Sequence, residues 1–153
     1  MITTEDIAEV VKVMWGQNTI LVGLVPGGII FGREPDTTVQ TQSPYATFEV
    51  KDNAVAKNAG FAYVQTFGVM ISTWDETGAA ATGPIKQQIE TTLGPWNGVS
   101  GLQPGSQVMT QSGRIIRFLQ SNKQPGGLEE DKDTQRGQAV KIAKDSYDFF
   151  CQG

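Results

Sequence analysis

The stretch FAYVQTFGVMISTW, residues 61–74, carries the clearest strand pattern in the chain. Apolar residues alternate between two faces at the period of a β-strand. One face carries Tyr63, Phe67, Val69 and Ile71, and the other carries Ala62, Val64, Met70 and Trp74. Because both faces are apolar, the pattern predicts a central strand covered on both sides.

Amphipathic helices are predicted before and after this strand. Ile7, Val10, Val11 and Met14 follow helical spacing, behind the capping residues Thr3 and Thr4. Asn18 is expected to cap a short helix over residues 19–25, although a buried strand fits that run as well. Later in the chain, Ile85, Ile89 and Leu93 are spaced by four. Gly83-Pro84 is expected as the N-cap and N1 pair, and Gly94-Pro95 as the stop.

The remaining strands are predicted to be shorter and joined by polar loops. They are expected at Ile29–Phe31, at Tyr45–Lys51, from Val108 to Leu119 with an interruption near Ser112-Gly113, and at Gln138–Phe150. Gly32 to Ser43 is expected to be a polar excursion, and Gln124 to Gln135 a mobile loop. Short connections argue against parallel crossover units. The sequence therefore predicts one α+β domain over residues 1–153, with a mainly antiparallel sheet and both helices on one face.

Composition excludes several classes of function. The 153 residues include no histidine and one cysteine, Cys151, so histidine-based nucleophile systems and histidine-containing zinc sites are excluded. The net charge is −4, and the sequence contains no cluster of Lys and Arg, so tight binding of nucleic acid is not expected. The acidic start does not have the character of a signal peptide, and no apolar run reaches the roughly 20 residues of a membrane span. We expect a soluble chain made in a cytoplasm.

Motifs for metal, phosphate or carboxylate chemistry are incomplete. The run Glu129-Glu130-Asp131-Lys132-Asp133 fails as a calcium loop, because the required glycine falls one place late and Ile142 stands where a glutamate is needed. The glycines of residues 26–32 are not followed by the Lys-Ser/Thr of a phosphate loop. Glu49, Asp52, Asp75 and Glu76 are expected at solvated or capping positions. We therefore expect no catalytic residue, no metal and no cofactor; a carboxylate-based enzyme is the remote alternative.

The layout resembles the phage tail-terminator (tail-completion) family. The resemblance rests on the opening helix around residues 7–14, the passage LVPGGII at 24–30, and the strand PYATFEV at 44–50. It continues with the long strand leading into the helix around residues 85–93. A charged loop with Asp133 and Arg136 then runs into the closing Tyr147-Asp148-Phe149-Phe150. The segments Gly32–Ser43 and Trp96–Gln103 depart from the family pattern.

This resemblance implies a structural virion protein without enzymatic activity. It implies a homo-hexameric ring at the neck of the tail, made in the host bacterial cytoplasm. Its partners would be the tail tube protein on one side and a neck or stopper protein on the other. DNA would pass through the ring without specific binding, and no membrane is involved.

Two polar segments are the candidate subunit-contact loops. Their residues are Arg33, Glu34, Asp36, Gln40, Gln124, Glu129, Glu130, Asp131, Asp133 and Arg136. Two other functions stay open at this level. The chain fits another neck, stopper or tube component, or a small-molecule-binding domain whose pocket is lined by Tyr63, Phe67, Ile85 and Ile89.

Overall fold

The computed structural model describes residues 2–32, 44–53, 64–75, 82–124, 128–133 and 138–152. The helices are α1 (Thr4–Gln17), α2 (Thr19–Leu24) and α3 (Thr82–Leu93). The strands are β1 (Ile29–Phe31), β2 (Tyr45–Asn53), β3 (Gln65–Asp75), β4 (Gln107–Met109), β5 (Ile115–Gln124), β6 (Leu128–Asp133) and β7 (Gln138–Gln152). No helix in these ranges is long and apolar enough to cross a membrane.

All the strands join one sheet in the order β1-β2-β3-β7-β5-β4, with β6 also paired to β7. Among the strands that the structure describes, only the β1–β2 pair is parallel. Every residue of β3 pairs with β7, and Thr66 to Trp74 also pair with β2. The predicted central strand and the mainly antiparallel sheet are therefore confirmed; residues 61–63 of the expected strand lie outside the described ranges.

The side chains of β3 alternate between the two faces of the sheet, as the sequence pattern predicts. Phe67, Val69 and Ile71 are buried in the main core. On the opposite face the Trp74 ring stacks on Tyr45, and its Nε1 donates a hydrogen bond to Thr47 Oγ1 at 3.0 Å. The face with Phe67 is therefore buried, whereas Met70 and Trp74 on the opposite face are half-buried, so the predicted cover on both sides is confirmed only in part.

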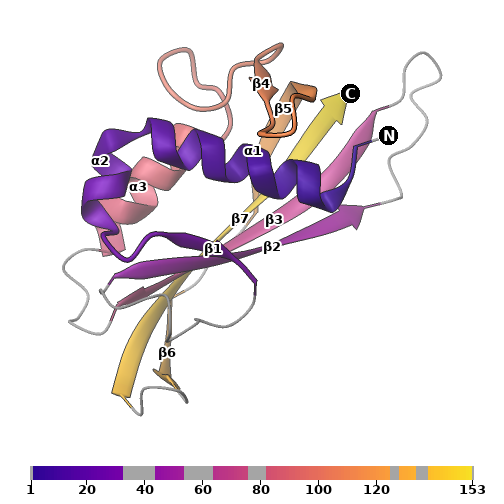
Figure 1. Cartoon of the computed structure of the whole chain (residues 1–153). Helices are drawn as coiled ribbons and strands as arrows, with labels where there is room; N and C mark the ends of the chain where they lie inside the picture. Colours follow the sequence, from indigo (N-terminus) through magenta and orange to yellow (C-terminus); the bar gives the residue numbers. More distant parts are fainter. Residues whose placement is uncertain are drawn as a thin grey trace.

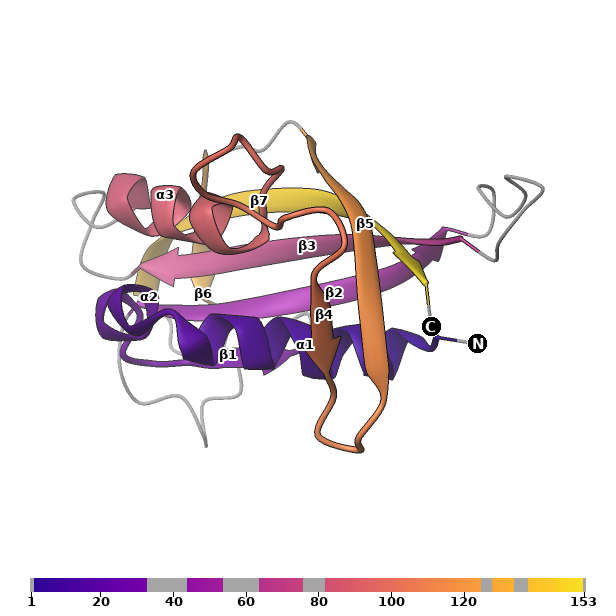
Figure 2. The same cartoon turned by 90° about the horizontal axis from the view of Figure 1, so that it is seen from above.

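The three helices lie on one face of the sheet, and the β4–β5 end of the sheet curls over the same side (Figures 1 and 2). Thr3 caps α1 through a capping box with Asp6, in which each side chain bonds the other's backbone N–H. The Asn18 side chain accepts from Leu21 N at 3.1 Å and so caps α2. The short helix is therefore the correct reading of residues 19–24.

Helix α3 packs its apolar stripe against the sheet. Ile85, Ile89 and Leu93 are fully buried. The helix begins at Thr82, so Gly83 and Pro84 lie inside its first turn, where proline is tolerated; the expected N-cap at Gly83 is wrong. The small-molecule pocket is also contradicted where the structure describes it, because Phe67, Ile85 and Ile89 are buried core residues and Tyr63 lies outside the described ranges.

The expected single interrupted strand over residues 108–119 is instead a hairpin. β4 pairs antiparallel with β5, and the chain reverses between Met109 and Ile115. Thr110 N donates to the Arg114 carbonyl at 2.8 Å, and Gly113 adopts a φ of +90° that favours glycine. The Ser112-Gly113 signal therefore marks a turn and not a bulge.

Candidate functional site

The described fold has an extended β-ribbon where the sequence suggested a mobile loop. β5 continues to Gln124, and Leu128–Asp133 forms β6, which pairs antiparallel with the first part of β7. The prediction of a loop over Gln124–Gln135 is therefore wrong for Gln124 and for residues 128–133, which lie in strands. Strand pairing with β7 satisfies the backbone groups of this charged segment, which the sequence pattern alone did not reveal.

The β6–β7 arm, residues 128–133 and 138–141, continues one end of the sheet, and its outer part, residues 131–133 and 138–140, projects beyond β3 (Figure 1, bottom). β3 pairs with β7 only as far as Lys141, opposite Asp75. Among the described strands, residues 138–140 therefore pair with β6 alone. A two-stranded ribbon is marginally stable by itself in water, so a projecting arm of this kind is suited to contacts with another chain.

The predicted contact residues divide between this arm and segments outside the described ranges. Glu129, Glu130, Asp131 and Asp133 lie in β6. Gln124 lies at the end of β5, where its Nε2 donates to Asp148 Oδ2 at 2.5 Å. Arg33, Glu34, Asp36, Gln40 and Arg136 fall outside the described residues. The structure thus brings four of the ten predicted residues into the β6–β7 arm, and Gln124 lies on the neighbouring strand β5.

A second projecting feature is the segment that follows α3. Val99 is 87% exposed and Trp96 is 38% exposed. The Asn97 Oδ1 accepts hydrogen bonds from the backbone N–H groups of Val99 at 2.9 Å and Ser100 at 2.8 Å. The segment therefore presents apolar side chains on a backbone that is already ordered, which lowers the entropy lost on binding.

Gly101 holds this segment in place. Its φ is +104°, and a Cβ there would lie 2.4 Å from the Pro95 carbonyl oxygen. We expect Gly101→Ala to lower the free energy of unfolding by about 2–3 kcal/mol, because strained φ and a backbone clash add together. Gly98→Ala is the matched control: its φ is +93° but its Cβ meets no atom within 4 Å, so about 1 kcal/mol is expected. Chemical denaturation of both variants measures the difference, and equal losses would contradict the role of the clash.

A groove of about 540 Å³ runs beside β4, and we call it the β4 groove. Its apolar lining residues are Met14, Ile20, Leu102 and Val108. Its other lining residues, among them Gln17, Thr92 and Gln107, carry amide or hydroxyl groups, and none is charged. Ile20 at the mouth is 59% exposed. The volume lies in the range of sites that bind small molecules or short segments.

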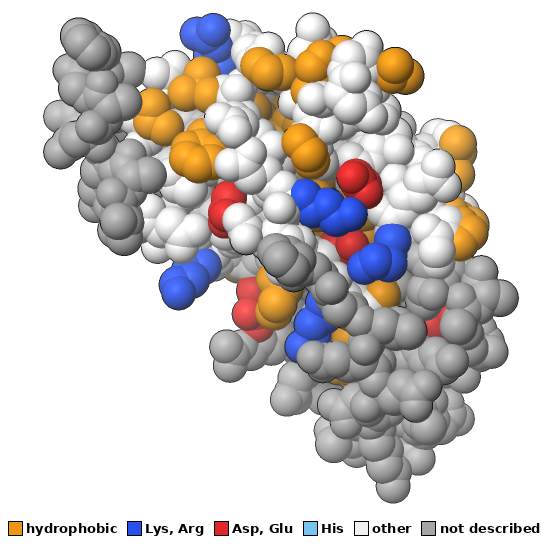
Figure 3. All heavy atoms as spheres, turned by 180° about the vertical axis from the view of Figure 1, so that it is seen from behind, with side chains coloured by type: hydrophobic (Ala, Val, Ile, Leu, Met, Phe, Trp, Pro, Cys, Tyr) orange, Lys and Arg blue, Asp and Glu red, His pale blue; other side chains and the backbone are white. Residues whose placement is uncertain are grey.

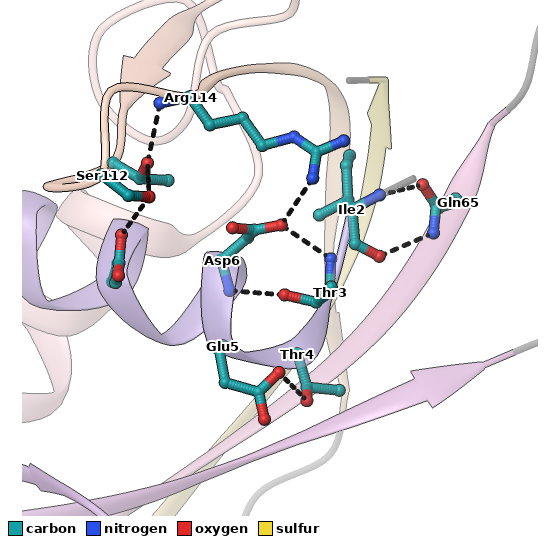
Figure 4. Close-up of polar contacts among 10 residues, drawn as sticks. Ile2, Thr3, Thr4, Glu5, Asp6, Gln65, Ser112 and Arg114 are labelled. Carbon is teal, nitrogen blue, oxygen red and sulfur yellow. Dashed lines mark hydrogen bonds and ion pairs between the residues drawn. The ribbon is translucent and has the colours of Figure 1, made fainter.

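The hairpin that carries β4 is tied to the start of α1 (Figure 4). Arg114 Nη1 forms an ion pair with Asp6 Oδ2 at 3.0 Å. Ser112 Oγ donates to a Glu9 carboxylate oxygen at 3.4 Å. Asp6 also accepts from Thr3 N at 2.8 Å, so one carboxylate connects the helix cap to the hairpin. These contacts fix β4 relative to α1, which forms one wall of the groove.

An ion pair between half-exposed Lys86 and buried Asp145 joins α3 to β7. Lys86 Nζ lies 2.9 Å from Asp145 Oδ1 and donates to the Lys144 carbonyl at 3.2 Å. The Asp145 side chain is 1% exposed, and its Oδ2 makes no hydrogen bond with the described residues. Burial raises the pKa of Asp145, and the neighbouring Lys86 only partly offsets that rise. The pair lies under α3 and fixes that helix on the sheet.

Two side chains weighed for chemistry in the sequence, Cys151 and Asp75, are buried. The described residues contain no group of three or more acidic, cysteine or histidine residues that could hold a metal ion. Burial raises the pKa of Cys151 to about 12, which disfavours the reactive thiolate. Asp75 is 1% exposed, so the solvated or capping position expected for it is wrong; Asp52 is exposed, and Glu76 lies outside the described ranges.

Charges of both signs lie close together on the face seen from behind, where Lys and Arg side chains neighbour Asp and Glu (Figure 3). Apolar side chains gather in the upper part of this view. A surface of mixed charge creates no strong field of one sign. The described residues of this face therefore present apolar patches of the kind suited to protein contacts, with charges of both signs interspersed.

Sequence reasoning did not single out Val99, Gln107 or Met109 as contact residues. The sequence does carry a sign of a contact surface in this region, because no Asp or Glu occurs between Glu90 and Glu129. The Asn97-Gly98 and Pro104-Gly105 turns also fall in this segment. Only the fold shows that the segment borders a groove and supplies an open sheet edge.

Comparisons with known proteins place the fold but not the family. No protein-family model and no curated protein matches the chain. A chain in the solved structure described as "Virion of native gene transfer agent (GTA) particle" matches with a TM-score of 0.60 and 13% sequence identity. The match covers 94% of this chain and 92% of that chain. The two chains therefore share a fold over nearly their whole lengths.

Proposed function

We propose that this chain is a structural virion subunit of the phage type, a tail terminator that forms a ring and joins the tail tube to the neck. The observation that carries the proposal is the fold shared with a chain of the gene transfer agent virion over 94% of this chain. The match extends over nearly the whole of both chains, so it does not rest on a common small motif.

Three surface features of the chain support assembly as its role. The β6–β7 arm projects from the body, the loop at Trp96 and Val99 presents apolar side chains, and the β4 groove is open. A closed ring needs two different complementary patches on each subunit. These features lie on different elements, so they supply separate patches for such a contact.

The proposed ring has six copies, the tail tube protein on one side and a neck or stopper protein on the other. DNA passes through the ring without specific binding, which agrees with the net charge of −4. The chain is proposed to act in the virion after synthesis in the host bacterial cytoplasm, and to carry no enzymatic activity. Another neck, stopper or tube component is the second candidate, because the same shared fold favours any of these virion positions.

The oligomeric state of the purified full-length chain tests this proposal. We expect light scattering to give the mass of six copies, about 99 kDa from the 16.5 kDa chain, and negative-stain images to show rings. The measurement is repeated with purified tail tube protein, since assembly sometimes needs its partner. A chain that stays monomeric in both cases would rule out the ring. An open filament of stacked copies would favour the tube alternative.

A further inference from the structure

The open edge of β4 is available for pairing with another strand. Thr110 N donates to the Arg114 carbonyl, and Phe118 N donates to the Ser106 carbonyl. Because hydrogen-bonding directions alternate along an antiparallel strand, the N–H and C=O groups of Gln107 and Met109 point away from β5. β4 is the last strand in the sheet order, so they point to the edge of the sheet.

This edge is short, but it carries neither of the two residue types that commonly prevent strand addition. Natural edge strands commonly carry charged residues or proline that prevent pairing with other chains. β4 consists of Gln107, Val108 and Met109, and Met109 is 57% exposed. The β4 groove beside it is uncharged. The partner that fits both the open edge of β4 and the β4 groove is therefore an uncharged, extended segment with strand propensity.

The chain itself contains such a segment in the sequence between β1, the strand at the opposite edge of the sheet, and β2. Thr37 to Ser43 reads TTVQTQS, with no charge, glycine or proline, and with the Thr and Val residues that favour strands. It belongs to residues 33–43, which connect β1 to the parallel strand β2. A chain of eleven residues can span at most about 36–40 Å. That reach exceeds the length of β1, which is only about 10 Å.

We infer that Thr37–Ser43 of one copy binds the β4 groove of the next copy and adds a strand to its sheet. β1 and β4 are the two ends of the sheet order, so this contact joins opposite edges of neighbouring copies. Such a contact is heterologous, and repeated around an axis it closes a ring. The inference rests on the proposed ring and names the segment and the surface that make it.

Disulfide trapping tests the contact in the full chain. Thr41→Cys is combined with Gln107→Cys in the groove or, as the matched control, with Gln120→Cys, an exposed glutamine of β5. The native Cys151 is fully buried and does not compete. Mild oxidation of the assembled protein is expected to give covalent multimers on a non-reducing gel for the 41–107 pair and few for the 41–120 pair. Rings that form without a preferential 41–107 cross-link overturn the inference and leave the ring itself standing.

A charge placed in the groove provides the second test. Ile20→Glu places a carboxylate at the mouth of the uncharged groove, whereas Val22→Glu places the same group on an exposed position of α2 that does not line the groove. Burying an unpaired carboxylate opposes association. We expect Ile20→Glu to raise the concentration for half-assembly at least about 10-fold, and Val22→Glu to leave it within about 2-fold. Equal behaviour of the two variants overturns the inference, whereas wild-type protein that never assembles refutes the proposed function instead.

Discussion

Replacement of Lys86 by methionine is expected to lower the free energy of unfolding by about 2–3 kcal/mol at pH 7. The change leaves the Asp145 carboxylate buried without its cation, and breaking a buried pair from one side typically costs about 3–5 kcal/mol. We expect the lower figure because the Lys86 side chain is 36% exposed, so water already screens part of the interaction. Urea denaturation of wild type and variant measures the difference.

Lys123→Met is the matched control for this prediction. Lys123 also bridges to α3, with its Nζ 2.9 Å from Glu90 Oε2, but the two side chains are 40% and 47% exposed. Exposed pairs contribute little, so a loss within about 1 kcal/mol is expected. Equal losses for the two variants would show that the burial of Asp145 does not set the cost.

The pH dependence of the same pair follows from the raised pKa of Asp145. The unfolded chain has the ordinary value near 3.8, and the folded pKa is higher, so the folded state holds the proton more tightly. Wild type should therefore gain stability relative to Asp145→Asn as the pH falls from 7 through the folded pKa, with the gain complete below about 3.8. Lys86, Lys123, Glu90 and Tyr147 face this carboxyl and stay the same in both proteins, so the difference isolates Asp145. A difference that is constant with pH would contradict the raised pKa.

Shortening the β6–β7 arm by two residues on each strand is expected to abolish ring assembly while the monomer stays folded. The deletion removes Lys132 and Asp133 with their cross-strand partners Ala139 and Gln138. It keeps the alternation of faces, because an even number is removed from each strand, and it leaves the net charge unchanged. Residues 138 and 139 pair with β6 alone among the described strands, so the deletion removes no pairing between β7 and β3.

Circular dichroism and thermal unfolding provide the control for the shortened chain. A melting temperature within a few degrees of wild type, together with the mass of a monomer, is the expected combination. A shortened chain that still forms rings would show that the arm is not part of the subunit contact. The proposed exchange of Thr37–Ser43 would then remain as the contact to be tested.

Much of the fold could be predicted, because several helices and strands are marked by patterns within their own residues. The alternation around Phe67 and Ile71 marks the central strand, and the spacing of Ile85, Ile89 and Leu93 marks α3. Thr3 and Asn18 are capping residues whose side chains satisfy backbone groups only a few positions away. Such interactions are encoded within a few residues, so the sequence is sufficient to find them.

The candidate surface could be predicted only in part, because strand pairing depends on residues that are far apart in the sequence. The acidic run at Glu129–Asp133 has the composition of a loop, yet pairing with residues 138–142 makes it a strand. The charged residue Asp145 is buried because Lys86, 59 positions earlier, reaches it from α3.

By itself, the amino-acid sequence determined the fold class, the starts of α1 and α2 and the central strand, because hydrophobic period and capping act over short distances. The tertiary structure alone decided that β4 forms an open edge beside an uncharged groove, and that β6 and β7 extend as an arm. Both features depend on which strands become neighbours. That choice is made by burial of the whole sheet against its helices, and no local pattern carries it.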